Sequence, residues 1–322
     1  MDSVGPTRRT LGRSGIAIGP LVFGGNVFGW TVDEATGHAL LDRFFAAGLN
    51  AIDTADVYSK WAPGNRGGES EAMIGRWLAR SSARREEVVL ITKVGSEIAP
   101  GRKGLSRRHI LQAVDDSLRR LQTDHIDVYL AHRPDGDTPI EETLAAFDTL
   151  LKAGKVRAIG GSNYDAAGLR AALAVSAERG LPRYEVLQPE YNLYDRASFD
   201  GALRELCTAE GIGVITYYSL ASGFLSGKYR SKADLGKSPR GQGVAKYLDE
   251  RGRRILAALD TVGERHKATP AEVALAWLVQ RPGVTAPIAS ATRLEQLESL
   301  IRATRLPLAA VDIELLDAAS AR

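Results

Sequence analysis

The chain has 322 residues, of which 44% are hydrophobic and 25% charged, and its formal net charge is +3. This is the composition of a globular protein, and so small a net charge argues against nucleic acid or a membrane surface as the main partner. The single cysteine, Cys207, excludes an intramolecular disulfide and a cysteine-based zinc cluster, and with no apolar secretory signal or bilayer-spanning stretch we expect a cytoplasmic protein.

The chain begins with "RRTLGRSGIAIG", in which turn residues separate two short β-like pieces. We expect a hairpin there that closes the floor of a barrel. After it, short apolar or β-branched runs alternate with amphipathic helical patterns. The predicted strands are 20–25, 48–54, 88–93, 126–131, 156–162, 184–190, 213–219 and 284–290.

Three of the helical patterns have clear limits. One covers 106–121, with Ser106 as its N-cap, a second covers 139–152, and a third covers 270–280, with Pro270 in its first turn. The polar, basic and glycine-rich stretch 227–247 precedes a further helix and predicts a surface loop. This loop is either a linker or a mobile flap that brings cations to a phosphate ligand.

Eight alternations of strand and helix predict a closed (β/α)8 TIM barrel, with an N-terminal hairpin and extra C-terminal helices, formed as a single domain by residues 1–322. A doubly wound open sheet is disfavoured because no G-x-G-x-x-G follows a predicted strand. "GFLSGKY" is not a P-loop, because its glycines are one residue too close and Tyr229 stands where Ser or Thr is required.

Polar residues leave three neighbouring predicted strands at the end where barrel enzymes place their sites. Asp53 and Tyr58 follow the second strand, Lys93 ends the third and His132 follows the fourth. Taken one at a time, each has a structural explanation: Asp53 could cap a turn, Tyr58 could be a packed aromatic, Lys93 could be a solvated strand end and His132 could be a core imidazole. Together they favour proton transfer to an oxygen. We expect Lys93 to lower the pKa of Tyr58 from about 10, Asp53 to hold Lys93, and His132 to orient a carbonyl oxygen.

The stretches "DTADVY", "ITKVG", "YLAHRPD", "GKVRAIGGSNY", "LQPEYNLYDR" and "TYYSLASGFLSGKY" resemble the aldo-keto reductase superfamily in order and spacing, over nearly the whole chain. The resemblance implies that Asp53, Tyr58, Lys93 and His132 form a catalytic tetrad. Tyr58 would be the general acid in carbonyl reduction and the general base in alcohol oxidation. The resemblance also implies an extended nicotinamide cofactor, NADP(H) in preference to NAD(H), held without a glycine fingerprint.

Cofactor contacts are implied by the same resemblance. The residues concerned are Ser162, Asn163, Gln188, Tyr217, Leu220, Gly223, Lys228, Ser290, Thr292, Arg293 and Gln296. Ser162, Asn163 and Gln188 would hold the carboxamide, and Tyr217 would stack on the nicotinamide. Leu220, Gly223 and Lys228 would approach the pyrophosphate. Ser290, Thr292, Arg293 and Gln296 belong to the corner that holds the adenosine 2′-phosphate at a helix N-terminus. The chain departs from the common pattern at Tyr218, Ser290 and Ser299-Leu300.

Four further residues are candidates for contact with a small-molecule carbonyl or alcohol substrate: Asn26, Phe28, Trp30 and Trp61. The polar "GNRGGE" predicts an open mouth, and therefore small or polar carbonyls or sugars rather than steroids.

Two other functions are weighed against this one. Some members of this fold are regulatory subunits of ion channels, which would bind the cofactor with little or no turnover. A metal-dependent hydrolase using His132, Asp135 and Asp137 is disfavoured, because the chain has only five histidines and no H-x-H pair at a strand end. The pattern does not indicate an oligomeric state.

Overall fold

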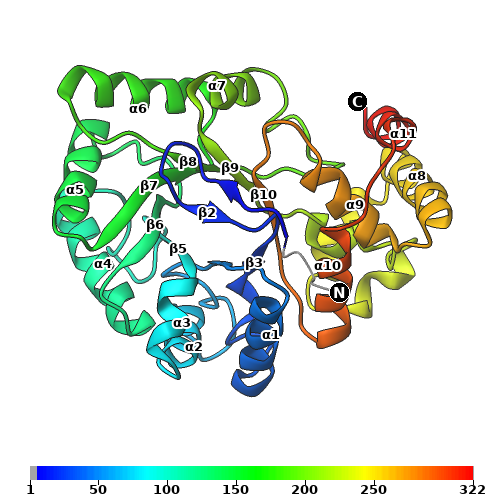
Figure 1. Ribbon diagram of the computed structural model, residues 1–322, viewed down its shortest axis with the longest axis horizontal. Coiled ribbons are helices and arrows are strands. Elements are labelled where there is room, and N and C mark those ends of the chain that lie inside the picture. The colour runs from blue at the N-terminus through cyan, green and yellow to red at the C-terminus, as the bar shows by residue number, and fades with distance from the viewer. Residues whose placement is uncertain (1–5, 322) are drawn as a thin grey trace.

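The computed structural model describes residues 6–321, without the side chains of Ser82 and Ala83, and at its centre is a closed barrel of eight parallel strands (Figure 1). Neighbouring strands pair in the order β10-β3-β4-β5-β6-β7-β8-β9, and β9 returns to β10. They are β3 (Val22–Gly24), β4 (Ala51–Asp53), β5 (Val89–Val94), β6 (Ile126–Ala131), β7 (Val156–Ser162), β8 (Val186–Gln188), β9 (Gly213–Thr216) and β10 (Ala286–Ala289). Each overlaps a strand predicted from the sequence, so the predicted barrel is confirmed.

The predicted N-terminal hairpin is also confirmed. β1 (Arg9–Thr10) pairs antiparallel with β2 (Ala17–Ile18), and the pair lies across the near end of the barrel in Figure 1. Leu11, Ile16 and Ile18 pack with the inward-facing side chains of the strands. Gly12 lies so close to the barrel that a Cβ would stand 2.4 Å from the Glu185 carbonyl oxygen. The hairpin therefore closes the floor of the barrel.

Helices surround the barrel on the outside (Figure 1). Those that follow the eight strands in turn are α1 (Glu34–Ala46), α2 (Glu69–Leu78), α4 (Arg107–Leu121), α5 (Ile140–Lys152), α6 (Ala166–Arg179), α7 (Ala202–Glu210), α9 (Pro270–Val279) and α10 (Leu294–Ala303). Additional helices are α3 (Ser82–Glu87), α8 (Glu250–His266) and α11 (Ala310–Ser320). The last is the predicted C-terminal extension.

Side-chain caps explain why the predicted helix limits hold. The Ser106 hydroxyl accepts a hydrogen bond from the His109 amide at the start of α4. At the start of α9, Thr269 and Glu272 cap one another reciprocally, and Pro270 occupies the first helical position, where no amide proton is needed.

Two apolar cores flank the barrel wall. One fills the barrel interior, and the larger one lies between the strands and the helices. Cys207 belongs to the larger core, as the sequence suggested, and burial raises the pKa of its thiol to about 12.

The stretch 227–247 is a surface segment built from short 3-10 turns. After η1 (Gly25–Val27), the 3-10 turns of the chain are η2 (Ala221–Ser226), η3 (Lys232–Lys237) and η4 (Gly241–Tyr247). Two of its own residues, Val244 and Tyr247, are buried. We call residues 227–247 the flap, because part of it lines the cavity described below.

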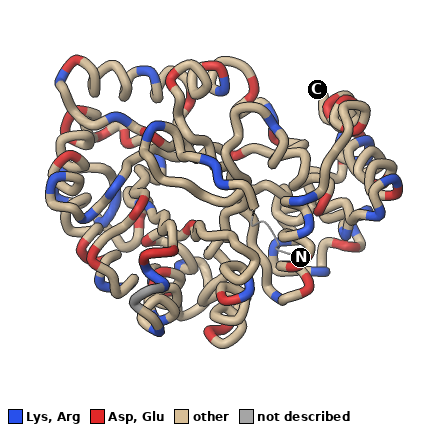
Figure 2. Tube along the Cα trace, in the orientation of Figure 1, with Lys and Arg blue, Asp and Glu red and all other residues tan. Residues whose placement is uncertain are grey.

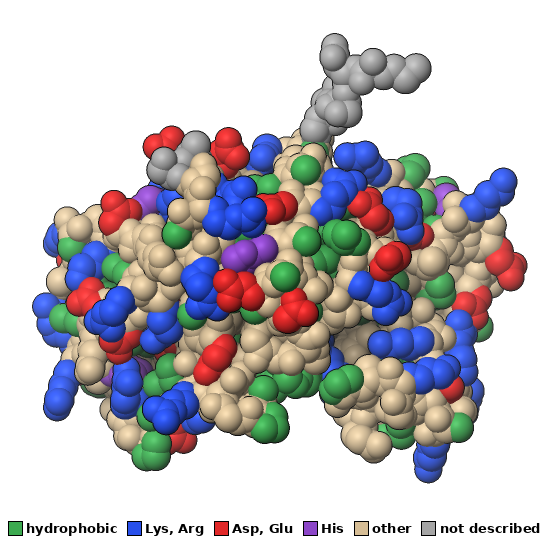
Figure 3. Space-filling view, turned by 90° about the horizontal axis from the view of Figure 1, so that it is seen from below, with side chains coloured by type: hydrophobic (Ala, Val, Ile, Leu, Met, Phe, Trp, Pro, Cys, Tyr) green, Lys and Arg blue, Asp and Glu red, His purple; other side chains and the backbone are tan. Residues whose placement is uncertain are grey.

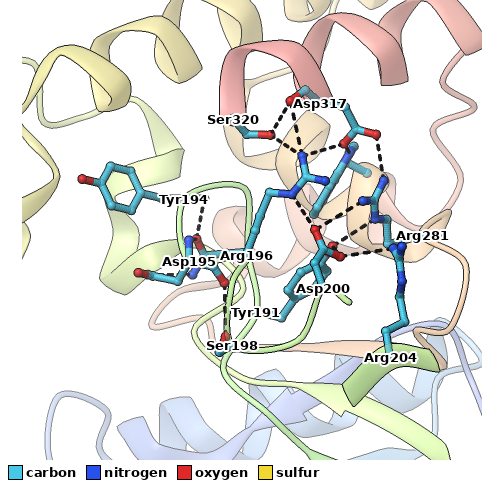
Figure 4. Close-up of polar contacts among 12 residues, drawn as sticks. Tyr191, Tyr194, Asp195, Arg196, Ser198, Asp200, Arg204, Arg281, Asp317 and Ser320 are labelled. Atoms are coloured by element: carbon cyan, nitrogen blue, oxygen red, sulfur yellow. Dashed lines mark hydrogen bonds and ion pairs between the residues drawn. The ribbon is translucent and has the colours of Figure 1, made fainter. Parts of the chain in front are cut away.

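The loop that follows β8 is fastened to the C-terminal part of the chain by a network of charges (Figure 4). Arg196 donates to Asp200 at 2.8 Å and to Asp317 of α11 at 3.1 Å. Arg281, which follows α9, donates to the same Asp317 at 2.8 Å. The network joins three segments that are distant in the sequence.

Charges of both signs are interspersed along the chain (Figure 2), and the face seen in Figure 3 mixes them with scattered hydrophobic side chains. None of the helices in the described part of the chain is both long and apolar enough to cross a bilayer.

Candidate active site

A cavity of about 1720 Å³ opens at the carboxyl ends of the barrel strands. It exceeds the 300–1000 Å³ or so that is typical of small-ligand pockets, so it has room for a dinucleotide together with a substrate. The predicted site residues that line it are Asn26, Asp53, Tyr58, Trp61, His132, Ser162, Asn163, Gln188, Tyr217, Leu220, Gly223, Lys228, Ser290, Thr292, Arg293 and Gln296.

Lys93 lies buried just beneath the cavity and organises its reactive end. Its Nζ donates to Asp53 Oδ1 at 2.6 Å, to the Thr54 carbonyl at 2.7 Å and to the Tyr58 hydroxyl at 3.0 Å. These three bonds use all three ammonium protons. Burial lowers the pKa of Lys93, and the Asp53 carboxylate opposes that effect.

Tyr58 accepts this hydrogen bond and donates its own proton to Asp53 Oδ2 at 3.2 Å. Burial, followed by the charge of Asp53, raises the pKa of Tyr58 well above its usual value. The pKa of Tyr58 therefore lies above its usual value and not below it as expected, because desolvation and the neighbouring carboxylate dominate. Tyr58 keeps its proton at neutral pH.

His132 stands beside Tyr58, with 6.1 Å between the ring centroids. Its Nδ1 is buried without a hydrogen-bond partner. Burial, with help from Lys93 and Arg133, lowers the pKa of His132 to about 3. The imidazole is therefore neutral at physiological pH and carries a single N–H.

Gln188 and Ser162 connect the far side of the barrel to Asp53 and its partners. The Gln188 amide donates to Asp53 Oδ1 at 2.8 Å, and the Ser162 hydroxyl donates to the Gln188 carbonyl at 2.8 Å. No described residue donates to the side-chain oxygen of Gln188. This oxygen is therefore free to accept a hydrogen bond from a ligand.

Asn163 connects His132 to Tyr217. Its side chain donates to the His132 carbonyl at 2.8 Å and accepts from the Tyr217 hydroxyl at 2.6 Å. Asn163 has φ +62°, a left-handed conformation that asparagine tolerates better than most residues. The strand end thus aims its amide across the cavity.

A strained segment follows Tyr217. Tyr218, Ala221 and Ser222 have φ of +53°, +48° and +57°, although none of them is glycine. The buried Asn192 donates to the Tyr218 carbonyl at 3.1 Å and holds the turn. Such strain is typical of ligand sites, where the surrounding structure imposes it.

At the opposite end of the cavity, Arg293 is the N-cap residue of α10. Thr292 donates its amide and its hydroxyl to Gln296 Oε1, at 2.8 and 3.0 Å, so these two residues bind one another in this structure. The Arg293 side chain is 66% exposed, and the one acid of residues 6–321 that it approaches is Glu295, at 3.7 Å. Its guanidinium and the helix N-terminus form a positive corner.

Ser290 and Asn26 also contact one another. The Ser290 hydroxyl lies 2.7 Å from Asn26 Oδ1 and 2.7 Å from the Gly24 carbonyl, so it braces β10 against β3. Both residues line the cavity, with these polar atoms already paired.

Among the predicted substrate residues, the prediction for Phe28 is wrong: it is buried and stacks on Phe23, with 5.3 Å between the centroids. Trp30 packs edge to face on Trp61 at 5.7 Å without lining the cavity itself. Trp61 lies at the mouth, 49% exposed and next to Tyr58.

The "GNRGGE" segment, from which the sequence predicts an open mouth, does not itself line the cavity. The Asn65 amide donates to the carbonyls of Gly29 and Ser59, which folds the segment away against the protein. Asn65 of this segment therefore serves local hydrogen bonding.

Sequence reasoning missed four residues that line the reactive end of the cavity: Ser96, Arg133, Tyr218 and Arg240. Three of them lie outside the predicted strands and helices, and Tyr218 falls within the predicted strand 213–219, although β9 ends at Thr216. Ser96 carries a buried hydroxyl without a partner. The one signal for them in the sequence is that polar residues follow the predicted strands.

The metal-hydrolase alternative gains no support. Asp135 accepts from the Leu105 amide, the Thr138 hydroxyl and the Asp137 amide, so its carboxylate shapes the loop. Over residues 6–321, no group of three or more His, Cys, Asp or Glu side chains is placed to hold a metal ion.

The chain is similar to a known protein family and to several known proteins. The family model described as "Aldo/keto reductase family" matches residues 20–321. An uncharacterized oxidoreductase, YrpG of Bacillus subtilis, is 36% identical over 309 residues, which cover 92% of this chain and 91% of that protein. Protein tas of Escherichia coli is 32% identical over 324 residues, or 92% of each chain. A probable voltage-gated potassium channel subunit beta of Arabidopsis thaliana is 33% identical over 302 residues, or 92% of this chain and 90% of that one.

Proposed function

The chain belongs to the aldo/keto reductase family, and on that premise we propose that it interconverts a carbonyl compound and the corresponding alcohol with NADP(H). Reduction adds a hydride to the carbonyl carbon and a proton to its oxygen, and oxidation reverses both transfers. The nicotinamide, when bound, supplies or receives the hydride. The protein supplies the proton, the geometry and the charge.

The cavity residues fit such a cofactor. The free side-chain oxygen of Gln188 suits the amide of a nicotinamide, and Tyr217 offers a ring on which to stack. Lys228 lines the cavity without an acidic partner among the described residues. The exposed guanidinium of Arg293 favours NADP(H) over NAD(H), because it can fork onto a phosphate at the start of α10.

The observation that carries the proposal is the Tyr58 hydroxyl, held between Lys93 and Asp53 at the reactive end of the cavity. In the reduction, Tyr58 turns its proton from Asp53 to the substrate oxygen, and the neutral His132 donates a hydrogen bond to the same oxygen. Lys93 then stabilises the phenolate through the bond it already makes. Acid–base assistance of this kind contributes about a hundred- to ten-thousand-fold in rate.

The test is oxidation of NADPH and, separately, NADH by the purified protein against a panel of aldehydes, ketones and aldoses. Tyr58→Phe should lower kcat by about a hundred- to ten-thousand-fold and leave the Kd for NADPH unchanged, as measured by fluorescence titration. Arg293→Gln should weaken NADPH binding and leave NADH binding unchanged. Full turnover by Tyr58→Phe would overturn the assignment of the proton donor.

A regulatory role remains the second candidate, because one relative is named a channel beta subunit. That reading expects tight NADPH binding with no turnover across the panel. The size class of the substrate is tested in the same assay, because we expect small or polar carbonyls to exceed steroid ketones in kcat/KM.

A further inference from the structure

Backbone strain in this protein is concentrated around the cavity. In the described part of the chain, the residues other than glycine that have a positive φ are Ser59, Gln122, Asn163, Tyr218, Ala221, Ser222 and Lys267. Gln122 and Lys267 are the C-caps of α4 and α8, where a left-handed residue is common. Asn163 and the turn 218–222 belong to the cavity wall. Ser59, with φ +71°, is the remaining one, and it directly follows the proton donor of the proposed reaction.

Ser59 is fully buried, and its side chain and its carbonyl both make hydrogen bonds. Its hydroxyl donates to the Phe28 carbonyl at 2.5 Å, and its own carbonyl accepts from the Ala62 amide and from the Asn65 side chain, both at 3.0 Å. A serine in the left-handed region is strained, because its Cβ crowds the following carbonyl oxygen. The surrounding contacts therefore hold Ser59 in a conformation that the free chain would rarely adopt.

The contacts of Ser59 join two loops at the same end of the barrel. Residues 25–32 form the first loop, which follows β3, and residues 54–68 form the second, which follows β4. The Ser59 hydroxyl binds the first loop from the second. The Asn65 side chain makes another such link, because it donates to the Gly29 carbonyl at 2.7 Å. Two hydrogen bonds thus cross from one loop to the other.

The two loops carry aromatic residues that pack on one another beside the reaction site. Trp30 of the first loop packs on Trp61 of the second, with 5.7 Å between the ring centroids, and Trp61 packs on Tyr58 at 6.0 Å. The Tyr58 amide donates to the Ala55 carbonyl at 3.1 Å. The main chain of Tyr58 is therefore fixed before it by a turn and after it by Ser59.

The position of the Tyr58 hydroxyl decides how well it can transfer a proton. This hydroxyl lies 3.0 Å from Lys93 Nζ and 3.2 Å from Asp53 Oδ2, and a substrate oxygen must come within hydrogen-bonding distance of it. A displacement of about 1 Å in a reacting group can lower the rate about a hundredfold. Contacts that fix the main chain at Tyr58 therefore bear on the rate.

We propose that Ser59 is a positioning residue for the proton transfer: its left-handed backbone and its bond to the Phe28 carbonyl join the loops after β3 and β4 into one rigid unit, which fixes Tyr58 and Trp61 relative to a bound carbonyl compound. The role in turnover rests on the proposed function, whereas the rigid unit does not. Ser59 touches no reacting atom, so its effect reaches the reaction through Tyr58.

Ser59→Gly removes the hydroxyl without adding strain, because glycine readily adopts a φ of +71°. We expect a melting temperature close to that of the wild-type protein and an unchanged Kd for NADPH. In the panel of aldehydes and ketones, kcat should fall by about 10- to 100-fold. The solvent isotope effect on kcat, measured in D2O, should rise, because a misplaced Tyr58 makes proton transfer limit the rate.

Hydrogen exchange followed by mass spectrometry tests the rigid unit without any turnover. The Thr31 and Val32 amides of the first loop donate to the Val27 carbonyl at 3.0 and 3.1 Å. If the loops open together, Ser59→Gly should speed exchange in peptides from residues 25–32 as well as from residues 54–68, although only the second loop carries the substitution.

Two further variants separate the hydroxyl from the backbone strain. Gln122→Gly is the matched control, because it also places glycine at a left-handed position, with φ +52°, but at the end of α4. It should leave kcat, the isotope effect and the exchange of both loops unchanged. Ser59→Ala loses the hydroxyl and keeps the strained Cβ, so we expect a kcat as low as that of Ser59→Gly and a lower melting temperature.

An unchanged kcat in Ser59→Gly would overturn the inference. A lower kcat with an unchanged isotope effect would also overturn it, because proton transfer would then not be the step affected. If the wild-type protein turns over none of the compounds, the proposed function fails, and hydrogen exchange still tests the rigid unit. Unchanged exchange of residues 25–32 in Ser59→Gly would then refute it.

Discussion

Asp56, three residues beyond the end of β4, is a buried acid that makes no ion pair with another described residue. Its Oδ1 has no hydrogen-bond partner. Lys93 donates its hydrogen bonds to other groups, and Arg120 is paired with Glu71 at 2.7 Å. Burial, followed by the charge of Glu71, raises the pKa of Asp56 to about 8. Asp56 is therefore a neutral acid at pH 7.

Asp56→Asn should raise the free energy of unfolding, and the gain should grow with pH. Between its unfolded pKa near 4 and its folded pKa of about 8, the folded state binds a proton that the unfolded state has lost, so the wild-type protein loses stability as pH rises. The asparagine removes this loss. Urea unfolding at acid, neutral and mildly alkaline pH measures it, with the exposed Asp137→Asn as control. A gain independent of pH would contradict the assignment.

The Lys93–Asp53 pair should behave as a coupled unit. Lys93→Met leaves Asp53 buried without its cation and should lower stability by about 3–5 kcal/mol. Adding Asp53→Asn removes the stranded charge, so the double variant should lose less than the sum of the two single variants. Denaturant titration of the three variants measures this coupling. Additive losses would show that the 2.6 Å contact contributes little.

At the scale of elements, the loop after β8 supports the strained turn beside Tyr217. Asn192 is buried, its side-chain oxygen accepts from the amides of Tyr194 and Asp195, and its nitrogen donates to the Tyr218 carbonyl. Asn192→Ala leaves the two amides unsatisfied, and we expect a loss of about 2–4 kcal/mol. We also expect weaker NADPH binding, since the left-handed turn is released.

Thermal unfolding and fluorescence titration check both effects in Asn192→Ala. Asn192→Asp retains the acceptor oxygen but turns a second, charged oxygen toward the Tyr218 carbonyl and the Asp195 carboxylate, so it should not recover the stability at neutral pH. If Asn192→Ala were destabilised with its NADPH affinity unchanged, the loop would support the fold and not the cofactor site.

The strands and helices could be predicted from their apolar patterns, and two of the helix starts also from their caps. Most inward-facing positions of the barrel strands are apolar, apart from polar residues at the carboxyl ends such as Asp53 and Lys93. Ser106 and Thr269 mark helix starts by their side-chain chemistry. The four residues of the predicted tetrad are brought together at one end of the barrel because strand ends meet at one face. Their catalytic roles remain to be tested.

The loops resisted prediction because tertiary contacts decide them. Phe28 follows a strand just as a site residue would, yet it stacks into the core. Arg240 lies far along the chain from Tyr58, and only the folded flap brings it to the cavity. The pKa of Tyr58 also depends on its depth of burial, which no local pattern records.

At the scale of the whole molecule, Asp317 of α11 joins the C-terminal helix to the barrel. It accepts from Arg196, Arg281 and the Trp277 indole at 3.1, 2.8 and 3.1 Å (Figure 4). Arg196, Arg281 and Asp317 are partly exposed, and only the Trp277 ring is fully buried. Asp317→Ala should therefore lower stability by about 1–2 kcal/mol and leave kcat unchanged.

Denaturant titration and the NADPH assay check this prediction for Asp317→Ala. Asp148→Ala, which breaks the exposed pair with Lys152, is the control and should cost less than about 0.5 kcal/mol. Equal effects of the two substitutions would show that the network adds nothing beyond a surface pair.

The burial of Lys93 has a consequence for chemical labelling of the protein. An amine-reactive reagent can reach the exposed lysines at once, but Lys93 is fully buried and its three protons are all engaged. Its modification must wait until the barrel opens, so its labelling rate reports the frequency of opening. A bound cofactor that stabilises the folded state should slow that rate in proportion to its occupancy. Mass spectrometry of the peptide that contains Lys93 would then read ligand binding without any enzymatic assay.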